Sequence, residues 1–318
     1  MKTITTALWF LVLAAMAAVR LDAAEGAGQP AGGAEIRIDA QRLKAFSGGA
    51  PFLEYRHGGP GLFKSYIAGL SLDGGKIQPL RDAPHDHLHH HALMLAFNVD
   101  GVEFWGVEDG SCGRMAHQGF ADTGVREDGR ITFTETLSWK APAPQGQEGK
   151  VLLQEVRRIA TRPAVSGGPQ MVDWDSVFRA PQGSGKATLT GREYHGLGVR
   201  FVVPMDQGGR FLNADGGAGV AGTNQKRSRW CSYAASPEPG VKVTLAMFDD
   251  PKNPRSPADW FTMDSGFAYM TLTMGLDAEP YVLAEDKTLR VHYGVALFKG
   301  EADAQVIEAA YREWFGGK

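Results

Sequence analysis

Residues 93–105 read LMLAFNVDGVEFW, and this stretch shows most clearly how the chain folds. Apolar residues lead up to the pair Asp100-Gly101 and resume after it. Because Asp-Gly readily adopts the positive φ angles of a two-residue type I′ turn, the stretch predicts a β-hairpin. Short segments with the same period-two alternation recur between Gly, Pro, Asp and Asn along the chain, which is typical of an all-β protein.

The alternation predicts eleven strands, at 35–39, 51–56, 63–68, 91–99, 102–105, 130–140, 151–159, 199–203, 242–248, 267–274 and 290–298. One helix is predicted over 301–315, with its apolar face formed by Ala302, Val306, Ala310 and Trp314. Many strands and a single helix predict a large antiparallel β-sandwich with a C-terminal helix, a class that includes the mutarotase-like supersandwich. We expect residues 34–318 to form one domain.

The first 24 residues have the layout of a secretory signal peptide: Lys2, then an apolar run over 7–19, then small residues at Ala23 and Ala24. The run is shorter than the roughly 20 residues that span a bilayer, and no later stretch is as long, so we expect no membrane span in the mature chain. Residues 25–33 read as a flexible lead-in. These features predict a secreted or periplasmic protein.

The formal net charge is −3, and the charges are interspersed without a basic block. This composition excludes the electrostatic pattern of a nucleic-acid binder. The two cysteines, Cys112 and Cys231, would enter an oxidising compartment. The sequence leaves open whether they pair or stay as two buried thiols, and it leaves the oligomeric state open as well.

Five histidines lie within residues 85–91, in the stretch HDHLHHH. If this segment is extended, His87 and His89 share one face and His90 points to the other. A His-x-His pair can bind one metal ion, but a complete site needs further ligands, and the available donors have no diagnostic spacing. We therefore predict no cofactor, and keep a divalent metal bound by the pair as an alternative.

A carboxylate interrupts an apolar strand face at Glu135, in RITFTETLSWK over 130–140. Alternation directs Glu135 into the core, where burial favours either a general acid or base or an ion pair with Arg157 or Arg158. In GREYHGLGVRF over 191–201, Glu193 and His195 share one side of an extended chain, so the carboxylate could orient the imidazole or the two could share a substrate.

Four motifs in this order resemble the uncharacterised secreted bacterial family labelled "PmoA-like": the histidine block from Asp86, VDGVEFW at 99–105, MAHQGF at 115–120 and PKNPRSPADWF at 251–261. Leu88 stands where the family usually has proline. The resemblance implies pocket positions for Asp86, His87, His89, His90, Glu103, Trp105, His117, Arg255 and Trp260. It also implies carbohydrate chemistry on a sandwich, whereas a methane oxygenase subunit would need several membrane-spanning helices.

The leading hypothesis is an exported enzyme that performs His-based acid/base chemistry on a glycoside or oxidised sugar, of the epimerase, lyase or hydrolase type. Its catalytic candidates are His87, His89 and His117, oriented by Asp86 or Glu193. The substrate-binding candidates are His90, Glu103, Trp105, His195, Arg200, Arg255 and Trp260, with the tryptophans stacking on a sugar ring. A metal-dependent enzyme and a non-catalytic glycan-binding domain are the alternatives.

Overall fold

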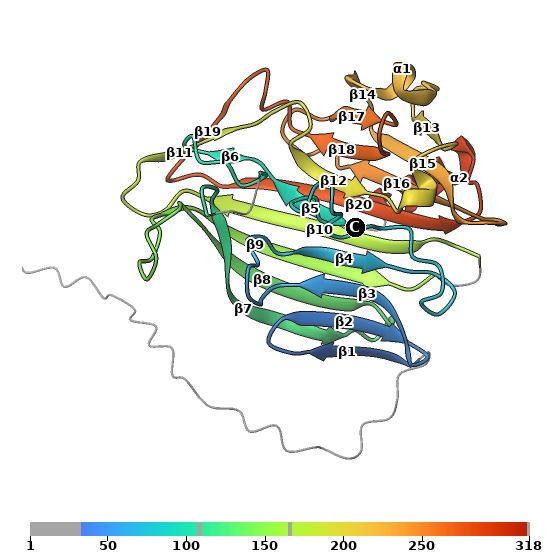
Figure 1. The fold of residues 1–318 in the computed structure, drawn as a ribbon, viewed down its shortest axis with the longest axis horizontal. Coiled ribbons are helices and arrows are strands. Elements are labelled where there is room, and N and C mark those ends of the chain that lie inside the picture. Colours follow the sequence, from blue (N-terminus) through green and yellow to red (C-terminus); the bar gives the residue numbers. More distant parts are fainter. Residues whose placement is uncertain (1–32, 107–109, 165–166, 317–318) are drawn as a thin grey trace, which may run out of the picture.

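The computed structural model describes residues 33–106, 110–164 and 167–316, and two large antiparallel β-sheets dominate them (Figure 1). The predicted signal peptide and all but the last residue of the predicted lead-in lie outside the described residues. The sheets confirm the predicted antiparallel β-sandwich with a C-terminal helix. No helix in the described ranges is both long and apolar enough to cross a membrane.

The first sheet has nine strands, and its middle is assembled from segments that are distant in the sequence. The chain leaves this sheet after β5 and re-enters it beside β5 with β12. In spatial order the strands are β1 (Ala34–Ile38), β2 (Arg42–Ser47), β3 (Ala50–Arg56), β4 (Tyr66–Leu70), β5 (Leu93–Ala96), β12 (Gly196–Arg200), β18 (Tyr269–Thr273), β17 (Asp259–Met263) and β14 (Lys226–Arg227).

The second sheet has eight strands, in the order β13 (Arg210–Asn213), β15 (Trp230–Glu238), β16 (Val241–Asp249), β20 (Leu289–Lys299), β10 (Gln170–Arg179), β9 (Val151–Arg162), β8 (Ile131–Lys140) and β7 (Arg114–Val125). A small sheet contains β19 (Tyr281–Ala284), β11 (Lys186–Thr190) and β6 (Asn98–Val99). The helical elements are η1 (Val203–Met205), α1 (Gly219–Thr223) and α2 (Ala304–Gly316).

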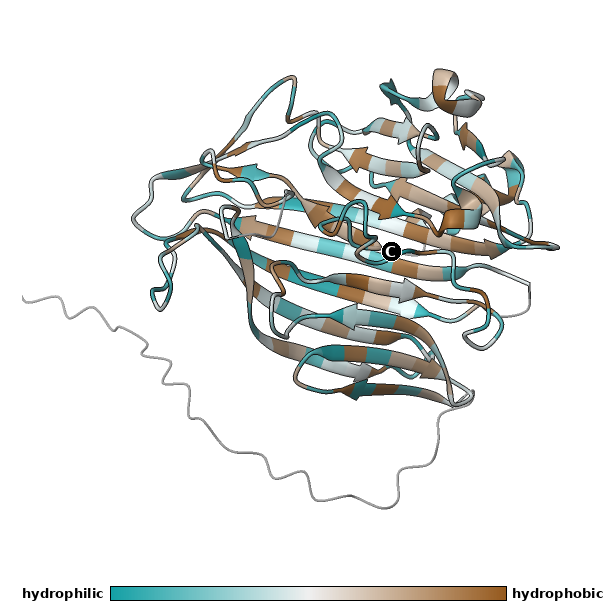
Figure 2. Cartoon of the chain, in the orientation of Figure 1, coloured by the Kyte–Doolittle hydropathy of each residue, from teal (hydrophilic) through white to brown (hydrophobic). Residues whose placement is uncertain are grey.

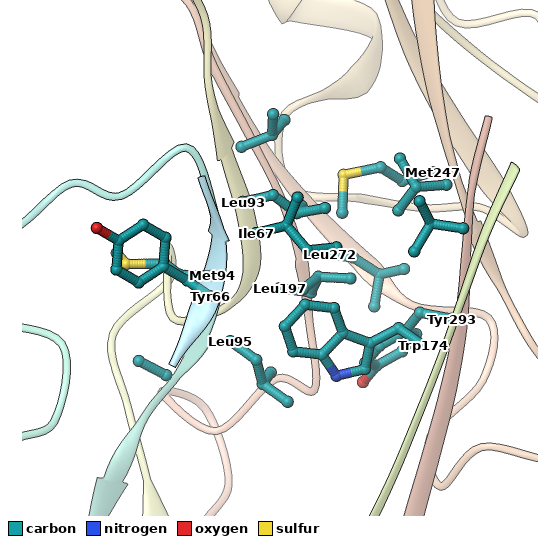
Figure 3. Packing of buried hydrophobic residues seen from close by; sticks show 14 of the residues in the cluster. Tyr66, Ile67, Leu93, Met94, Leu95, Trp174, Leu197, Met247, Leu272 and Tyr293 are labelled. Carbon is teal, nitrogen blue, oxygen red and sulfur yellow. The ribbon is translucent and has the colours of Figure 1, made fainter. Parts of the chain in front are cut away.

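The core lies between the two large sheets, because each strand turns alternate residues toward the other sheet. Figure 2 shows this alternation of hydrophobic and hydrophilic residues along the strands. Leu197 of β12 stands beside Leu95 and Leu272 in register, and these side chains face Trp174 and Tyr293 of the opposite sheet (Figure 3). Each such fully buried side chain stabilises the fold by about 1.5–3 kcal/mol.

The nine-stranded sheet has a second face, turned away from the eight-stranded sheet, which we call the outer face. Tyr66 and Met94 lie on it, on the far side of their strands from Trp174 (Figure 3). Met94 is nevertheless fully buried, so loops cover this face. Side chains on the outer face are therefore buried too, beneath loops, in addition to those in the core between the sheets.

The predicted turn at Asp100-Gly101 is present, with φ angles of 49° and 81°. The predicted second arm at 102–105 is wrong as a strand, because only Val102 bridges back to Val99. Strand β6 pairs instead with β11. The turn thus sends the chain away from the sheet, and Trp105 lies in the loop that follows.

Helix α2 begins at Ala304, where the Asp303 carboxylate accepts the backbone N–H groups of Gln305 and Val306 at 2.9 Å each. Such a side-chain cap satisfies donors that the first turn leaves unpaired. The predicted apolar face is wrong at Val306, which is 48% exposed. The buried face carries Ile307, Tyr311 and Trp314, because these residues pack on Phe248 and Phe298 of the eight-stranded sheet.

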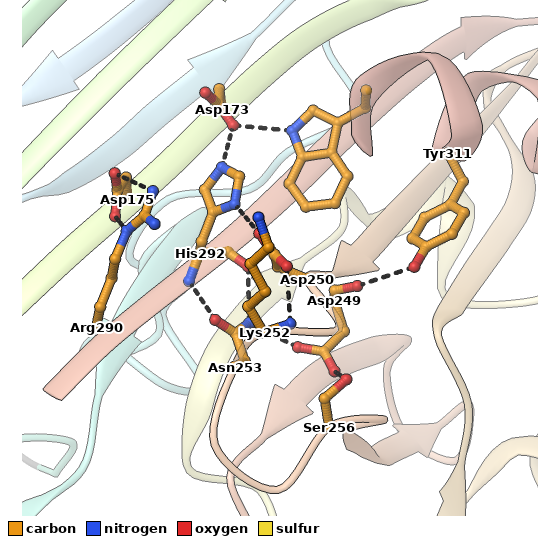
Figure 4. Close-up of polar contacts among 11 residues, drawn as sticks. Asp173, Asp175, Asp249, Asp250, Lys252, Asn253, Ser256, Arg290, His292 and Tyr311 are labelled. Atoms are coloured by element: carbon orange, nitrogen blue, oxygen red, sulfur yellow. Dashed lines mark hydrogen bonds and ion pairs between the residues drawn. The ribbon is translucent and has the colours of Figure 1, made fainter. Parts of the chain in front are cut away.

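Polar contacts also attach α2 to that sheet, through His292 of β20 (Figure 4). The His292 ring meets Asp250 through Nδ1 and Asp173 through Nε2, both at 2.6 Å. Trp314 of α2 stacks on the ring and donates its Nε1–H to Asp173 at 2.8 Å. The helix is therefore held by a buried imidazole between two carboxylates as well as by apolar packing.

Both cysteines lie in the described part of the chain and are buried. Cys112 and Cys231 are not joined by a disulfide. Of the two outcomes that the sequence left open, the structure shows two buried thiols.

Candidate functional site

The histidine segment at 85–91 forms two consecutive turns and not the extended chain that we assumed. The backbone N–H of His87 donates to Pro84 O, and that of His90 donates to His87 O, both at 2.9 Å. A turn brings residues three apart together, so His87 and His90 stack at 4.5 Å between ring centroids. The prediction that His90 points away from His87 and His89 is therefore wrong.

These turns cover the outer face over strands β12 and β18. Arg200 of β12 stands beside Tyr269 of β18 in register, and Gly198 stands beside Thr271. A Cβ on Gly198 would lie 1.8 Å from the Tyr269 hydroxyl, so only glycine leaves room for the tyrosine there. His90 lies above this surface, with its ring centroid 5.5 Å from that of Tyr269.

Aromatic rings surround the same place. Trp105 stacks on His195 at 5.0 Å with an interplanar angle of 14°, and Tyr194 meets Trp105 at 5.6 Å. The Arg200 guanidinium lies 3.5 Å from the centre of the Phe267 ring. We call this group the outer-face cluster: Asp86, His87, His89, His90, Trp105, Tyr194, His195, Arg200, Phe267, Tyr269 and Thr271.

Eight buried polar atoms of the outer-face cluster make no hydrogen bond of good geometry. They are His90 Nδ1, Trp105 Nε1, both ring nitrogens of His195, Nε and Nη1 of Arg200, Tyr269 Oη and Thr271 Oγ1. Buried polar atoms in folded proteins nearly always have a partner, and each one left without costs about 1–3 kcal/mol. Their concentration between aromatic rings indicates a place where water or a ligand supplies the partners.

The buried histidines of the cluster are neutral near pH 7. Burial, together with the neighbouring charges of His89, His87 and Arg200, lowers the pKa of His90 to about 3. Burial and the charge of Arg192 lower the pKa of His195 to about 3 as well. A neutral imidazole has one donor and one acceptor nitrogen, so both rings can hydrogen-bond a hydroxyl group in either direction.

Asp86 connects the exposed and buried parts of the cluster. Its Oδ2 atom accepts from Arg200 Nη2 at 3.0 Å and lies 3.1 Å from His87 Nδ1. Burial works to raise the pKa of Asp86, but the contacts with His87 and Arg200 outweigh burial and lower it to about 2. Asp86 is therefore an ionised carboxylate that orients His87, whose side chain is 37% exposed.

Two more predicted residues, Glu103 and Glu193, lie at the margin of the cluster, near Tyr194. Burial raises the pKa of Tyr194, and the nearby charges of Glu103 and Glu193 add to this rise. Glu103 is half-buried and Glu193 is exposed. Because neither ring nitrogen of His195 has a partner, the predicted orientation of His195 by Glu193 is wrong.

Three predicted site residues lie elsewhere. Trp260 is in the core, with its Nε1–H donated to Ser228 O at 2.8 Å. The guanidinium of Arg255 is bonded to main-chain carbonyls of residues 274, 275, 279 and 280, so it fixes a loop. His117 contacts His57, Phe120 and Glu135, which are not members of the outer-face cluster.

Sequence reasoning missed Phe267, Tyr269 and Thr271. The signal was present, because the predicted strand at 267–274 places Phe267, Tyr269 and Thr271 on one face. That face carries aromatic and hydroxyl groups, whereas the other carries Ala268, Met270 and Leu272.

Glu135 points inward as predicted and is fully buried. It accepts the hydroxyls of Tyr55 and Ser65 (2.9 Å for Ser65 Oγ), and His117 Nδ1 lies 2.6 Å from it. The predicted direct ion pair with Arg157 or Arg158 is wrong, because Arg157 pairs with Glu155 at 2.7 Å. Arg157 still joins the group by donating to Tyr55 Oη at 3.0 Å.

We call Tyr55, Ser65, His117, Glu135, Glu155 and Arg157 the buried carboxylate network. It extends through Trp139 Nε1 and Ser176 Oγ, which both donate to Glu155. In residues 33–106, 110–164 and 167–316, no group of three or more His, Cys, Asp or Glu side chains is placed to hold a metal ion. The His-x-His alternative thus has no third protein ligand in that part of the chain.

Fold and site together define an antiparallel β-sandwich protein with a cluster of buried polar and aromatic side chains on the outer face of one sheet. The chain belongs to a family of unknown function, DUF6807, whose model matches residues 42–312. No curated protein matches the chain.

Among the solved structures that match this chain are three of low identity. The α-galactosidase from Lactobacillus brevis is 9% identical with a TM-score of 0.45, over 90% of this chain and 42% of that one. The GH36 α-galactosidase AgaB from Geobacillus stearothermophilus is 7% identical with a TM-score of 0.44, over 84% and 41%. A putative aldose 1-epimerase from Escherichia coli K12 is 10% identical with a TM-score of 0.37, over 84% and 99%. The chain therefore spans about two fifths of the length of these α-galactosidases.

Proposed function

We propose that this protein binds a glycoside or an oxidised sugar at the outer-face cluster and acts on it as an enzyme of the epimerase, lyase or hydrolase type. The observation that carries the proposal is the set of unpartnered polar atoms between aromatic rings. A sugar ring presents apolar C–H faces beside many hydroxyls. Half-buried rings such as Tyr194 and Phe267 suit the former, and neutral donors and acceptors suit the latter.

In this proposal His87 is the general acid or base. An efficient acid or base has a pKa near the working pH, so His90 and His195, whose pKa values lie about 3, are better suited to holding hydroxyls. His87 is accessible, and the ionised Asp86 fixes its orientation through Nδ1. That arrangement leaves Nε2 as the nitrogen that exchanges a proton with the substrate.

We propose in addition that the protein is exported to the periplasm or beyond. The layout of residues 1–24, with a charged start, an apolar run and a small-residue cleavage site, supports this proposal. The N-terminal residue of the protein recovered from the native cell envelope tests it: a start near residue 24 or 25 is expected, and an intact Met1 on cytoplasmic protein would contradict it.

A sugar panel with variants of one loop tests the enzymatic proposal. Neutral sugars, glycosides and sugar acids are incubated with the protein, and products are followed by NMR and mass spectrometry. His87→Asn should lower turnover by about 10²- to 10⁴-fold while calorimetry shows nearly unchanged sugar binding. His85→Asn, a change at the exposed neighbouring histidine, is the matched control and should keep full turnover.

The same experiment separates the rival interpretation. The glycan-binding alternative predicts sugar binding that Trp105→Ala abolishes, with no product for any member of the panel. Full turnover in His87→Asn would overturn the assignment of His87. Failure of every sugar to bind would overturn the carbohydrate proposal as a whole.

A further inference from the structure

A second histidine pair lies apart from the outer-face cluster, beside the buried carboxylate network. His57 directly follows β3, and His117 is on β7 next to a bulge in its pairing with β8. Their ring centroids are 4.6 Å apart, and Phe120 packs against both rings at 4.6–4.7 Å. Segments that are far apart in the sequence thus bring two imidazole rings and the Phe120 ring together.

The separation of the rings matches that of two ligands on one ion. Imidazole nitrogens bind Zn²⁺ at about 2.0–2.1 Å, which places the centres of two rings on one ion at about 4.5–5.2 Å. Apolar packing of two imidazole rings does not by itself explain ring nitrogens that lack hydrogen-bond partners. Here both nitrogens of His57 lack a hydrogen bond of good geometry, although the residue is only 7% exposed.

Each ring also has the support that metal-binding histidines usually have. Such a histidine donates its other N–H to a carboxylate or a main-chain carbonyl. His117 Nδ1 meets the Glu135 carboxylate at 2.6 Å, which leaves Nε2 for a ligand. The main-chain carbonyls of Asp39 and Arg42 lie near His57, and either one can accept its second N–H.

We propose that His57 and His117 bind one first-row transition-metal ion through one nitrogen each, with water completing the coordination. The His117 side chain is 26% exposed, so the ion and its waters have a route from solvent. Glu135 is the positioning residue, because it fixes the tautomer and the ring plane of His117. By the usual order of affinities, Cu²⁺ should bind more tightly than Zn²⁺, and Mg²⁺ should not bind.

The proposal does not depend on the sugar site, since the two places share no contact among the described residues.

Metal binding to the full-length mature protein, stripped with a chelator, tests the inference. Calorimetric titration with CuCl₂ and ZnCl₂ should show one saturable site, absent with MgCl₂. His57→Gln and His117→Gln should each weaken binding at least tenfold, and Glu135→Gln should weaken it about 10- to 100-fold. Electron paramagnetic resonance of the Cu²⁺ form should show coupling to two nitrogens, falling to one in either histidine variant.

The matched control is the double variant His87→Asn/His89→Asn, which removes the His-x-His pair and should leave the titration unchanged. Near-ultraviolet circular dichroism of each variant without metal shows whether it is folded. Loss of binding in the double control with retention in folded His57→Gln and His117→Gln would overturn the proposal in favour of the histidine segment. Absence of saturable Cu²⁺ binding to the unmodified protein would overturn it outright.

Discussion

The outer-face cluster and the buried carboxylate network contain the same kinds of residue, but they satisfy their polar atoms in opposite ways. Glu135 accepts two hydroxyls and contacts an imidazole, and Arg157 binds a carboxylate, a hydroxyl and a main-chain carbonyl. In the outer-face cluster, Arg200 uses one nitrogen on Asp86 and leaves two buried nitrogens without a partner. The buried polar atoms of Glu135 and Arg157 therefore have partners within the protein, whereas two buried nitrogens of Arg200 do not.

This difference gives a physical criterion for telling a structural polar group from a binding group. A complete network costs stability when one member is removed, because the others become buried and unpaired. An incomplete cluster already has buried polar atoms without partners in the folded state. Removing those groups should therefore not lower the free energy of unfolding, but it should weaken ligand binding. Three experiments can test the comparison, in the order of the stability change that each substituted variant is expected to show, from the largest to the smallest.

Removal of the network's central cation should have the largest effect. Arg157→Leu leaves the fully buried Glu155 carboxylate without its ion pair, so the free energy of unfolding should fall by about 3–5 kcal/mol. Urea denaturation followed by tryptophan fluorescence measures it. Arg158→Leu, on the exposed side of the same strand, should change stability by less than about 0.5 kcal/mol. A loss below about 1 kcal/mol in Arg157→Leu would contradict the assignment of a structural network.

Acid should destabilise the protein through the outer-face cluster. An unfolded histidine takes up a proton near pH 6.5, but His90 and His195 do so in the folded state only near pH 3. Stability should therefore fall as the pH is lowered from about 6.5 to 3, by about 1.4 kcal/mol per pH unit for each ring. In His195→Gln the slope between pH 6 and 4 should be smaller by one such increment. Parallel slopes for variant and unmodified protein would show that His195 titrates normally.

Removal of the Tyr269 and Thr271 hydroxyls should have the smallest effect on stability. Tyr269→Phe/Thr271→Val deletes both hydroxyls together, so neither is left unpaired, and the free energy of unfolding should stay the same or rise by up to about 1 kcal/mol. Affinity for the sugar identified in the panel should fall about tenfold. Tyr66→Phe is the matched control, since its hydroxyl is bonded to Asp82 and its loss should destabilise the protein. A destabilised double variant would place Tyr269 and Thr271 with the structural groups.

Strand alternation was a reliable guide wherever a strand formed. In β8 it placed Glu135 in the core with Phe133 and Leu137, as the structure confirms. The same rule explains Trp174 of β10, which stands between Asp173 and Asp175 in the sequence. Trp174 is fully buried while its two neighbours face outward. Successive residues of a strand face opposite sides of the sheet, so the sequence alone assigns each residue to a side, whatever the rest of the fold is.

Strand alternation did not predict the structure where the chain turns. Helical periodicity did not predict which face of α2 is buried, because packing sets the rotation of the helix about its axis. The histidine segment is bent by hydrogen bonds to Pro84 and His87, and this bend stacks His90 on His87. Helix α2 was predicted at the right place, but its buried face is set by Phe248 and Phe298, which lie far away in the sequence. The buried face of α2 depends on contacts between distant segments, whereas the bend of the histidine segment comes from hydrogen bonds between residues three apart, which strand alternation does not describe.

The sequence by itself determined the β class, the Asp100-Gly101 turn, the inward carboxylate at Glu135 and the presence of a C-terminal helix. Each of these follows from short-range sterics and from the need to bury one face of a strand or helix. Only the tertiary structure decided which histidines meet: His90 with Tyr269 over β18, and His117 with His57 beside β3. Those pairings depend on which strands become neighbours, and that order is set by burial across the whole sandwich.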